Sequence, residues 1–435
     1  MPAELPHIVI VGAGFGGLAA TKSLRDAAAR LTLIDRTNHH LFQPLLYQVA
    51  TAVLTPAHIA APIRGILHRQ KNLTVLMGEV LSVDQRNRRI HAEVAGHSKL
   101  AIQYDYLILA TGARHSYFGH DEYEQYAPGL KTLADAVAIR NRILRTFEFA
   151  EARADTPPAE WLTFILVGAG PTGVEMASAI ASGRKLISAL YRHIDASSIR
   201  VVLIDQAARV LPTFAESLSR RAHRRLMKLG VDVRLGLRVD QVDIEGVIAG
   251  GQRILSATVI WTAGVAPSPV GKWLEAETDR AGRVRVGSDC TLPGHPEIFV
   301  IGDVATIAHN GKPLPGLAQV AIQQGRYVAR VIRNRLAHAR PPAAFRYWDK
   351  GNMTVVGKNF AVLESGWLRL SGFFAWLIWS TVHLISLASP GLRLMVFVQW
   401  VWTYLTNQPG SGLIIEHRAQ ATVDSVARID DQPSA

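Results

Sequence analysis

The chain has 435 residues, enough for more than one domain, and its 49% hydrophobic content indicates a large core. The net charge of +12 favours an anionic partner, such as nucleotide phosphates, an acidic lipid surface or nucleic acid. The single cysteine, Cys290, excludes an internal disulfide, a CxxC redox pair and a cysteine zinc cluster, and we expect it to be a small buried side chain.

The N-terminal segment carries no basic region followed by a signal-type cleavage site, which predicts a cytoplasmic location. Ile8–Val11 and Leu31–Ile34 read as buried parallel strands around a helix over Leu18–Ala29. Between the first strand and the helix lies a G-x-G-x-x-G loop, which lets the backbone and the helix N-terminus approach a pyrophosphate. An acid at the end of the second strand suits ribose hydroxyls. The candidate cofactor residues here are Gly12, Gly14, Phe15, Gly16, Gly17 and Asp35.

The same pattern returns with strands Phe164–Val167 and Val201–Ile204 around a helix through Ala177–Ala181. This internal duplication predicts two dinucleotides, one held and one exchanged. Its acid lies further from the loop than the usual spacing of about 20 residues, which predicts a longer crossover segment around Gly183–Ser197. An acid favours NADH over NADPH, although Arg209 could soften that preference. The candidates are Gly168, Gly170, Pro171, Thr172, Gly173 and Asp205.

Three further strands end in small-residue turns. Tyr106–Leu109 and Thr258–Trp261 occupy equivalent places in the two halves, and Ile298–Ile301 comes last. Pro157-Pro158 is a natural linker before the second half. The turn residues that we expect near a cofactor are Thr111, Gly112, Ala263, Gly264, Gly302 and Asp303.

The C-terminal region is rich in tryptophan. Trp367–Ala388 is an apolar run long enough, at about 1.5 Å per residue, to cross a hydrocarbon core as one helix, while Leu392–Leu405 is too short. Three interpretations remain open: a helical hairpin in a dimer interface, a spanning helix, and a pair of helices lying at the membrane surface. Polar interruptions and the excess of tryptophan favour the last. The stretch from Gln420 to Ala435 is expected to be a polar tail.

Taken together, these motifs resemble the two-dinucleotide flavoprotein reductases and, among them, the type II NADH:quinone oxidoreductases, also called alternative NADH dehydrogenases. The resemblance covers roughly residues 6 to 406. Ala318–Gly325 matches the family's A-Q-x-A-x-Q-Q signature, and Phe42–Tyr47 and Asp349–Gly351 match two further family segments. Gly412–Ile415 departs from the family, because a basic residue often precedes the Leu-Ile pair there.

The resemblance implies tightly bound FAD on the first loop and NADH as co-substrate on the second. It places Pro44 and Leu45 along the flavin and Asp303 at its ribityl chain. Each remaining role has a plainer alternative: a solvated helix face for the glutamines, a first-turn helix acid for Glu175 and a surface lysine for Lys350. The residues implied at the flavin–quinone pocket or the reacting ring are Ala318, Gln319, Gln323, Glu175 and Lys350, the last two as a candidate pair.

The expected fold is α/β, with two Rossmann-like dinucleotide-binding domains and a C-terminal amphipathic helical anchor. The predicted division is 1–155 for the first part of the FAD-binding domain, 156–280 for the inserted NADH-binding domain, 281–345 for the second FAD part, and 346–435 for the membrane-anchoring region with its tail.

The implied activity is that of a respiratory, non-proton-pumping NADH dehydrogenase: hydride passes from NADH to FAD, and two electrons then reduce a membrane quinone. The enzyme would be monotopic on the cytoplasmic side of the inner membrane, and a homodimer is left open. A sulfide:quinone or disulfide reductase would need a cysteine pair, and the histidines lack metal-ligand spacing. The rivals are a soluble FAD-dependent NAD(P)H reductase with a protein acceptor such as ferredoxin, and a flavin redox sensor. Scattered Arg and Lys argue against nucleic acid.

Overall fold

The computed structural model describes residues 5–153, 157–309, 312–406, 408 and 410–415. The chain divides into two compact units, and each is built from three segments. Unit 1 comprises Met1–Leu41, Ala60–Arg114 and Val265–Asp349, and unit 2 comprises Phe42–Ile59, His115–Gly264 and Lys350–Ala435. Each unit is described in turn.

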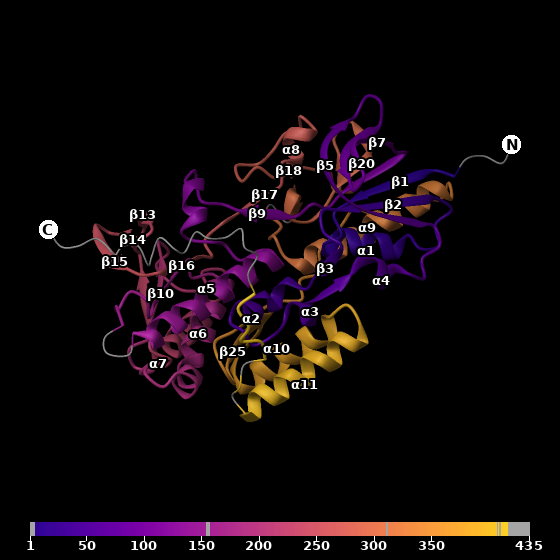
Figure 1. Ribbon diagram of the computed structural model, residues 1–435. Coiled ribbons are helices and arrows are strands. Elements are labelled where there is room, and N and C mark those ends of the chain that lie inside the picture. The colour runs from indigo at the N-terminus through magenta and orange to yellow at the C-terminus, as the bar shows by residue number, and fades with distance from the viewer. Residues whose placement is uncertain (1–4, 154–156, 310–311, 407, 409, 416–435) are drawn as a thin grey trace. The chain divides into compact units, whose positions relative to one another are not determined.

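Unit 1 is built on an eight-stranded sheet (Figure 1). Its strands from β20 to β5 run parallel, and the central strands β8, β1 and β2 are buried along most of their length, as their continuous apolar segments predict. The strand order is β19 (Thr291–Leu292), β20 (His295–Val300), β8 (Tyr106–Leu109), β1 (His7–Val11), β2 (Arg30–Asp35), β5 (Leu73–Asp84), β6 (Arg89–Val94) and β7 (His97–Gln103). The four predicted strands that fall in this sheet, β1, β2, β8 and β20, are therefore confirmed.

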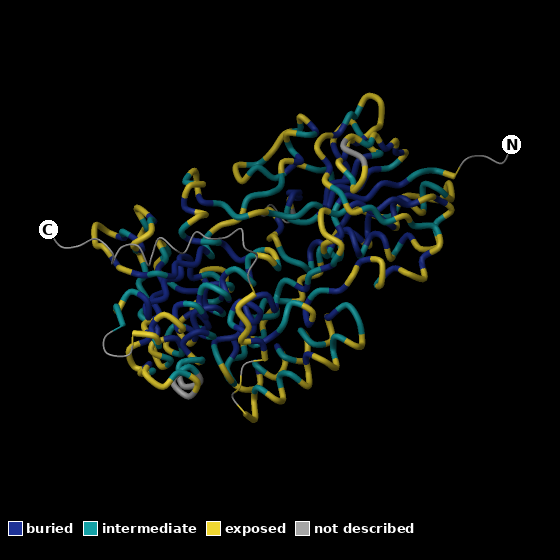
Figure 2. The backbone as a smooth tube through the Cα atoms, in the orientation of Figure 1, coloured by how far each residue is buried: buried dark blue, intermediate teal, exposed yellow. Residues whose placement is uncertain are grey.

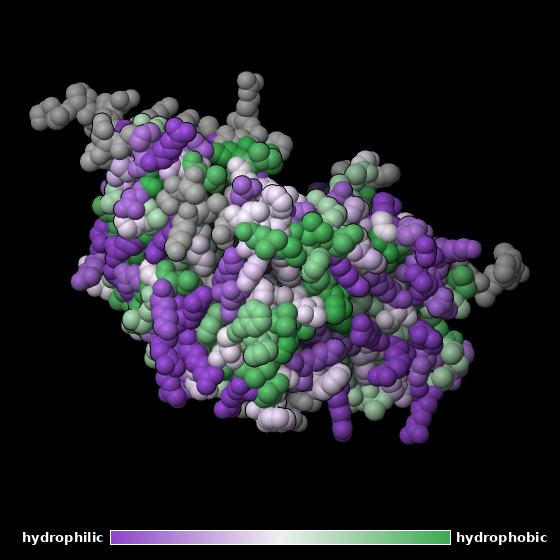
Figure 3. All heavy atoms as spheres, turned by 90° about the horizontal axis from the view of Figure 1, so that it is seen from below, coloured by the Kyte–Doolittle hydropathy of each residue, from purple (hydrophilic) through white to green (hydrophobic). Residues whose placement is uncertain are grey.

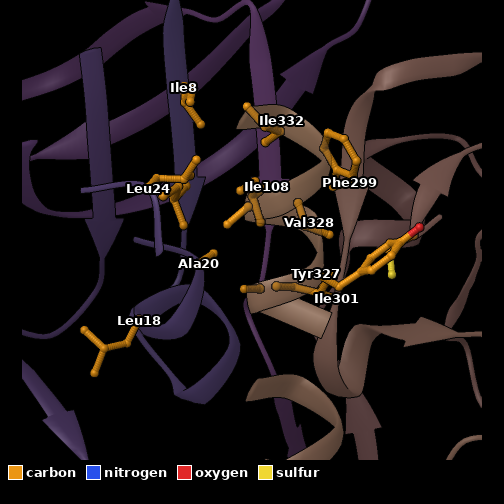
Figure 4. Close-up of a cluster of buried hydrophobic side chains, with 14 of the residues drawn as sticks. Ile8, Leu18, Ala20, Leu24, Ile108, Phe299, Ile301, Tyr327, Val328 and Ile332 are labelled. Carbon is orange, nitrogen blue, oxygen red and sulfur yellow. The ribbon is translucent and has the colours of Figure 1, made fainter. Parts of the chain in front are cut away.

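Two helices, α1 (Phe15–Ser23) and α9 (Ala318–Leu336), pack against each other and supply the main core of this unit. Figure 4 shows apolar side chains of β1, β8 and β20 meeting those of the two helices. The helices approach closely at glycines: a Cβ on Gly325 would lie 2.2 Å from the Gly16 carbonyl oxygen. Cys290 is fully buried, as expected.

Helix α1 is shorter than predicted and ends at Ser23. The side-chain amide of Asn72 explains this end, because its Nδ2 donates to the carbonyls of Leu24, Ala27 and Ala29 at 3.2–3.3 Å. Those carbonyls thus find partners in a turn instead of a further helical repeat.

The smaller elements of unit 1 connect the sheet to its helices. They are β3 (His39–Leu41), β4 (Ala60–Pro62), α4 (Ile63–Leu67), β17 (Val265–Pro267), α8 (Val270–Trp273), β18 (Val284–Arg285), η3 (Gly302–Val304), β21 (Ala305–Thr306), β22 (Ala308–His309) and β23 (Lys312–Pro313). A further short strand, β9 (Ala113–His115), spans the change from unit 1 to unit 2 along the chain.

Unit 2 repeats the same parallel arrangement. Its main sheet has the order β12 (Val231–Leu235), β11 (Arg200–Asp205), β10 (Thr163–Val167) and β16 (Thr258–Trp261). The trio β11-β10-β16 corresponds to β2-β1-β8, which confirms the duplication read from the sequence. The long helix α6 (Pro171–Leu190) and the loop after it make up the predicted longer crossover.

The remaining elements of unit 2 surround this sheet. They are η1 (Gln43–Leu45), α2 (Leu46–Ala50), α3 (Pro56–Ile59), η2 (Asp121–Gln125), α5 (Leu133–Ala152), α7 (Glu216–Lys228), β13 (Val239–Asp243), β14 (Gly246–Ala249), β15 (Gln252–Leu255), β24 (Asn352–Val355), β25 (Ala361–Ser365), β26 (Leu368–Gly372), α10 (Phe373–Ser386) and α11 (Pro390–Thr406).

The apolar run over 367–388 does not form one helix. Its first residues belong to β26, which pairs with β25, and the left-handed Gly372 (φ 94°) turns the chain into α10. Within the described residues, no helix combines the length and the apolar character needed to cross a bilayer. The spanning-helix alternative is therefore wrong, while the predicted polar tail from Gln420 onward lies outside the described residues.

The compact units follow other boundaries than the predicted domains. Helix α2 contacts α5 and α6, and α7 contacts β25, so residues 42–59 and 350–415 pack with the second sheet. The cause is tertiary contact between segments far apart in sequence, which local composition does not reveal. The functional labels on the four predicted segments stay a prediction.

Candidate dinucleotide and quinone sites

The first glycine loop leaves a free helix N-terminus. Gly14 is the N-cap of α1, no described side chain caps that end, and a Cβ built on Gly14 would meet nothing within 4 Å. By contrast, a Cβ on Gly17 would lie 1.8 Å from the Gly12 carbonyl oxygen, so this glycine serves the packing of the turn. Uncapped N–H groups facing open space fit a pyrophosphate. Phe15 and Gly16 begin the helix behind them.

Asp35 fixes the loop from the end of β2. Its two carboxylate oxygens accept from the backbone N–H groups of Ala13 (2.6 Å) and Thr37 (2.7 Å). The Thr37 hydroxyl also donates to Oδ1 at 2.8 Å, and because a carboxylate offers about four acceptor sites, capacity remains for a ribose hydroxyl. His40, which the sequence reasoning missed, holds the same turn through a 2.8 Å bond between Nδ1 and the Ala13 carbonyl, and its ring packs edge-on against Phe15.

Two further turns of unit 1 carry predicted flavin residues. Thr111 Oγ1 hydrogen-bonds Ser268 Oγ, and the Gly112 carbonyl accepts from the Ser268 N–H at 3.1 Å. Gly302 adopts a left-handed φ of 75°, and its N–H donates to Gln324 Oε1 at 2.7 Å. Gln324 is buried and was missed as a site residue; its place in the glutamine run of α9 was the available signal. It fixes the turn that presents Asp303 in η3.

The two predicted glutamines of α9 differ. Gln323 is committed to its own unit: its Nε2 donates to the Trp348 carbonyl and its Oε1 accepts from the Trp348 N–H, both at 3.0 Å. Gln319 is half-buried, and its side chain has no hydrogen-bond partner in the described part of the chain. Ala318 starts the helix. The free amide on this helix therefore belongs to Gln319, whereas Gln323 anchors the segment before residue 350.

The second glycine loop repeats the geometry of the first in unit 2. Gly170 is the uncapped N-cap of α6, Pro171 is the first helical residue, and a Cβ on Gly170 would again meet nothing within 4 Å. Asp205 accepts from the N–H groups of Ala169 (2.5 Å) and Ala207 (2.7 Å), as Asp35 does in unit 1. Gly168 and Gly173 form the tight turn, with Thr172 beginning the helix behind it.

The turn after β16 closes this loop from the other side. Thr262, missed from the sequence, donates from Oγ1 to the carbonyls of Val167 (2.9 Å) and Gly168 (2.8 Å). Ala263 and Gly264 follow, and Gly264 has a left-handed φ of 80°. Arg209 donates from Nη2 to the Pro212 carbonyl at 2.7 Å.

Glu175 lies in the second turn of α6, so the first-turn helix acid is not its role. Its Oε1 accepts from Thr354 Oγ1 at 2.9 Å, and the Val355 N–H also donates to the carboxyl. Burial raises the pKa of Glu175 from 4.5 to about 8, and these hydrogen bonds only partly oppose it. The carboxyl is therefore mostly protonated at pH 7. Its partners are Thr354 and Val355 and not Lys350, which is exposed.

A hydrogen-bonded chain links the Phe42–Tyr47 segment to α11. Trp400 Nε1 donates to Gln48 Oε1 (2.7 Å), and Gln48 Nε2 donates to Tyr47 Oη (2.8 Å). Burial, reinforced by the charge of Glu175, raises the pKa of Tyr47 well above 10, which keeps this hydroxyl protonated. In η1, Leu45 is fully buried while Pro44 is partly exposed, so of the two Pro44 is the side chain open to a ligand.

Helices α10 and α11 expose a broad apolar surface. Figure 2 shows them largely in the colours of intermediate and exposed residues, whereas the central strands are buried. Figure 3, a view from below, shows hydrophobic side chains gathered on this face. The apolar residues of α10 and α11 that are at least 37% exposed are Phe373, Phe374, Leu377, Ile378, Val382, Ile385, Leu394, Met395, Phe397, Val398, Val401, Trp402, Tyr404 and Leu405. This set is called the apolar face below.

Comparison with known proteins agrees with this geometry. The model of the pyridine nucleotide-disulphide oxidoreductase family matches residues 6–325. Two relatives from Mycobacterium tuberculosis, the type II NADH:quinone oxidoreductases Ndh and NdhA, are 43% and 42% identical, cover 97% and 93% of this chain, and are themselves covered to 92% and 88%.

Among solved structures, NDH2 from Plasmodium falciparum in complex with NADH superposes with a TM-score of 0.84 at 21% identity, over 95% of this chain and 100% of that one. The sulfide:quinone oxidoreductase of Aquifex aeolicus shares the fold at a TM-score of 0.70 and 17% identity, over 99% of this chain and 96% of that one. The chain carries one dinucleotide loop in each unit, and its sequence matches these relatives over nearly its whole length. It therefore belongs to the type II NADH:quinone oxidoreductases of the pyridine nucleotide-disulphide oxidoreductase family.

Proposed function

We propose that this chain is an FAD-dependent NADH:quinone oxidoreductase that works at a membrane surface without pumping protons. The observation that carries the proposal is the repeated loop geometry. Each of the two loops ends at an uncapped helix N-terminus, has open space beside its N-cap glycine, and is hydrogen-bonded by a carboxylate, that of Asp35 or Asp205. One chain therefore offers two dinucleotide sites of the same design. When bound, FAD supplies the chemistry, accepting a hydride from NADH and giving two electrons to quinone.

The residues of unit 1 would hold FAD. The N–H groups behind Gly14 meet the pyrophosphate, Asp35 accepts from the ribose, and the Gly302 turn presents Asp303 to the ribityl chain. Gln319 keeps an uncommitted amide for the flavin or the quinone.

The residues of unit 2 would hold NADH and a proton. Asp205 favours NADH, because a 2′-phosphate would be repelled by the carboxylate. Glu175, mostly protonated at pH 7, stores a proton on its carboxyl group that can be given up when quinone is reduced. We place Lys350 near the same chemistry as an exposed cation, without a direct pair to Glu175.

We further propose that the apolar face lies in the headgroup region of the cytoplasmic side of the inner membrane, as a monotopic anchor. So large an exposed apolar surface marks an interaction site. Basic residues border it: Arg221 donates to Ser371 at 2.8 Å, and Lys358 donates to the Tyr404 carbonyl at 2.9 Å. Basic groups beside an apolar surface suit anionic lipid. A homodimer that shares this face is the competing occupant.

Turnover with purified protein tests the activity. We expect sustained oxidation of NADH with a short-chain quinone, accompanied by cycles of flavin bleaching and return. Reduction of a ferredoxin without reduction of quinone would instead support the soluble reductase, and a single reduction of flavin without turnover would support a redox sensor. Either result would overturn the proposed activity.

Vesicle flotation tests the anchor separately. We expect the protein to float with vesicles of phosphatidylglycerol and phosphatidylcholine, and we expect the double variant Trp402→Glu, Leu405→Glu to lose about tenfold or more in affinity. Met227→Glu on α7 is the matched control, because Met227 is similarly exposed but lies outside the apolar face. If the control and the double variant float equally well, the face does not bind lipid.

A further inference from the structure

Unit 2 contains a cavity of about 110 Å³ that the proposed function does not use. It lies among helices α2, α5 and α6, and Gly412 borders it. Most of its lining is apolar, with Ile143, Phe147 and Ile187 among the larger side chains. Gly183 in its wall is twelve residues beyond the start of α6, about 18 Å along the helix from the second glycine loop. The cavity is therefore separate from that loop.

One charged side chain lines this cavity, that of Arg140. Arg140 is 1% exposed, and its Nη1 donates to Ser411 Oγ at 3.0 Å. Its Nε and Nη2 are buried and have no hydrogen-bond partner among the residues that the structure describes. A guanidinium stays charged in proteins, and a buried charge normally has a counter-ion and filled hydrogen bonds.

The neighbouring Arg142 shows how the same helix satisfies a structural arginine. Its Nε donates to the Ala257 carbonyl at 3.0 Å and its Nη1 to the Tyr126 carbonyl at 2.7 Å. Arg140 receives no such carbonyls and no carboxylate among the described residues, and burial alone lowers its pKa. Two free N–H directions beside an apolar cavity fit an anion that the described residues do not supply.

The rim beside Arg140 is held in place by hydrogen bonds of its backbone N–H groups. The Ser411 N–H donates to the Ala52 carbonyl at 3.0 Å, and the Ile415 N–H donates to Asn141 Oδ1 at 3.2 Å. The segment 411–415 is thus fastened to α5 and to the end of α2, which is where the sequence departs from the family pattern. The position of Ser411, which accepts from Arg140, is therefore fixed before any ligand binds.

We propose that this cavity binds the anionic head of a small amphiphile, a carboxylate or phosphate that carries an alkyl chain, with the Arg140 guanidinium as its counter-ion. The head accepts from Nε and Nη2, and the start of the chain lies against Ile143 and Phe147. The volume is of the same order as the roughly 150 Å³ cavity that takes up benzene, so only a short apolar stretch is enclosed and the rest of a longer chain leaves through the open side.

Binding of decanoate and of uncharged decanol to the FAD-loaded protein, in a fixed concentration of non-ionic detergent, tests the proposal by calorimetry. We expect decanoate to bind at least tenfold more tightly than decanol. Arg140→Met should remove this preference while leaving decanol binding unchanged. Equal affinity of the two probes for the unmodified protein, or an unchanged preference in Arg140→Met, would overturn the proposal.

A second variant keeps the test sound if Arg140→Met misfolds. Gly183→Leu fills the cavity from helix α6, where a Cβ meets nothing within 4 Å and a glycine costs helix stability. It should weaken both probes at least tenfold; unchanged binding would place them on the apolar face instead and refute the site. Competition with short-chain phosphatidylglycerol then identifies the source of the anionic head. If this lipid displaces decanoate, the natural ligand carries a lipid phosphate; if it does not, the ligand carries a free carboxylate. Both outcomes agree with an anionic head. This readout is independent of turnover.

Discussion

The proton on Glu175 gives the most direct test of the site. Its carboxyl has an ordinary pKa of 4.5 in an unfolded chain and a pKa of about 8 in the folded protein. The folded state binds the proton more tightly than the unfolded chain does. The ionisation of Glu175 therefore leaves the free energy of unfolding unchanged below pH 4.5 and lowers it as pH rises from 4.5 to 8. At about 1.36 kcal/mol per pKa unit, the full loss is on the order of 5 kcal/mol, and partial exposure reduces it to roughly 2–4 kcal/mol.

Glu175→Gln removes this loss, since glutamine keeps the shape and cannot ionise. We expect the variant and the unmodified protein to melt together near pH 5, and the variant to melt roughly 2–4 °C higher at pH 9. Thermal unfolding of FAD-loaded protein across this pH range, followed by circular dichroism, measures the difference. Glu124→Gln, at an exposed glutamate, is the control. Stability curves that run parallel from pH 5 to 9 would refute the raised pKa and with it the proton store.

The other predictions concern the cofactor loops. Gly14→Val should fold but fail to retain FAD, seen as loss of flavin absorbance, because the side chain enters the open space at α1; yellow protein of normal content would contradict this. Gly170→Val should keep FAD and raise the KM for NADH about tenfold or more. Asp205→Ser should lower the ratio of kcat/KM for NADH over NADPH by about tenfold; an unchanged ratio would assign the preference elsewhere. Gln324→Leu should destabilise unit 1 by about 1–3 kcal/mol, measured by denaturation, because it leaves the Gly302 N–H without its acceptor.

The parallel strands and both loops could be predicted because their signals are local. Continuous β-branched runs, a glycine loop and a terminal acid all lie within one short stretch, and the structure places Asp35 and Asp205 equivalently. The family resemblance supplied Gln319, Gln323 and Glu175, but it could not show that Gln323 is bound to Trp348. That distinction depends on a segment twenty-five residues away.

The residues that sequence reasoning missed act through long-range contacts. His40, Thr262 and Gln324 each hydrogen-bond a backbone group of a glycine turn, and none lies in the loop motif that it supports. The spanning-helix alternative for the apolar run after Trp367 is wrong because hydropathy does not register strand pairing: β26 pairs with β25. Periodicity thus located the elements, while tertiary contacts decided their ends.

The hydrogen-bonded chain from Trp400 through Gln48 to Tyr47 has a consequence for how the enzyme should be handled. Trp400 is on a helix whose outer residues meet water in the isolated protein, while Tyr47 is buried and its pKa is raised by that burial and, when Glu175 is ionised, by the Glu175 charge. A lipid or protein surface that covers α11 therefore also limits the motion of the Tyr47 side chain, which lies close to the Glu175 carboxyl. Rates measured in micelles and in bilayers should differ even at saturating quinone. The surroundings of α11 determine how ordered the Tyr47 side chain is, as well as how quinone reaches the protein.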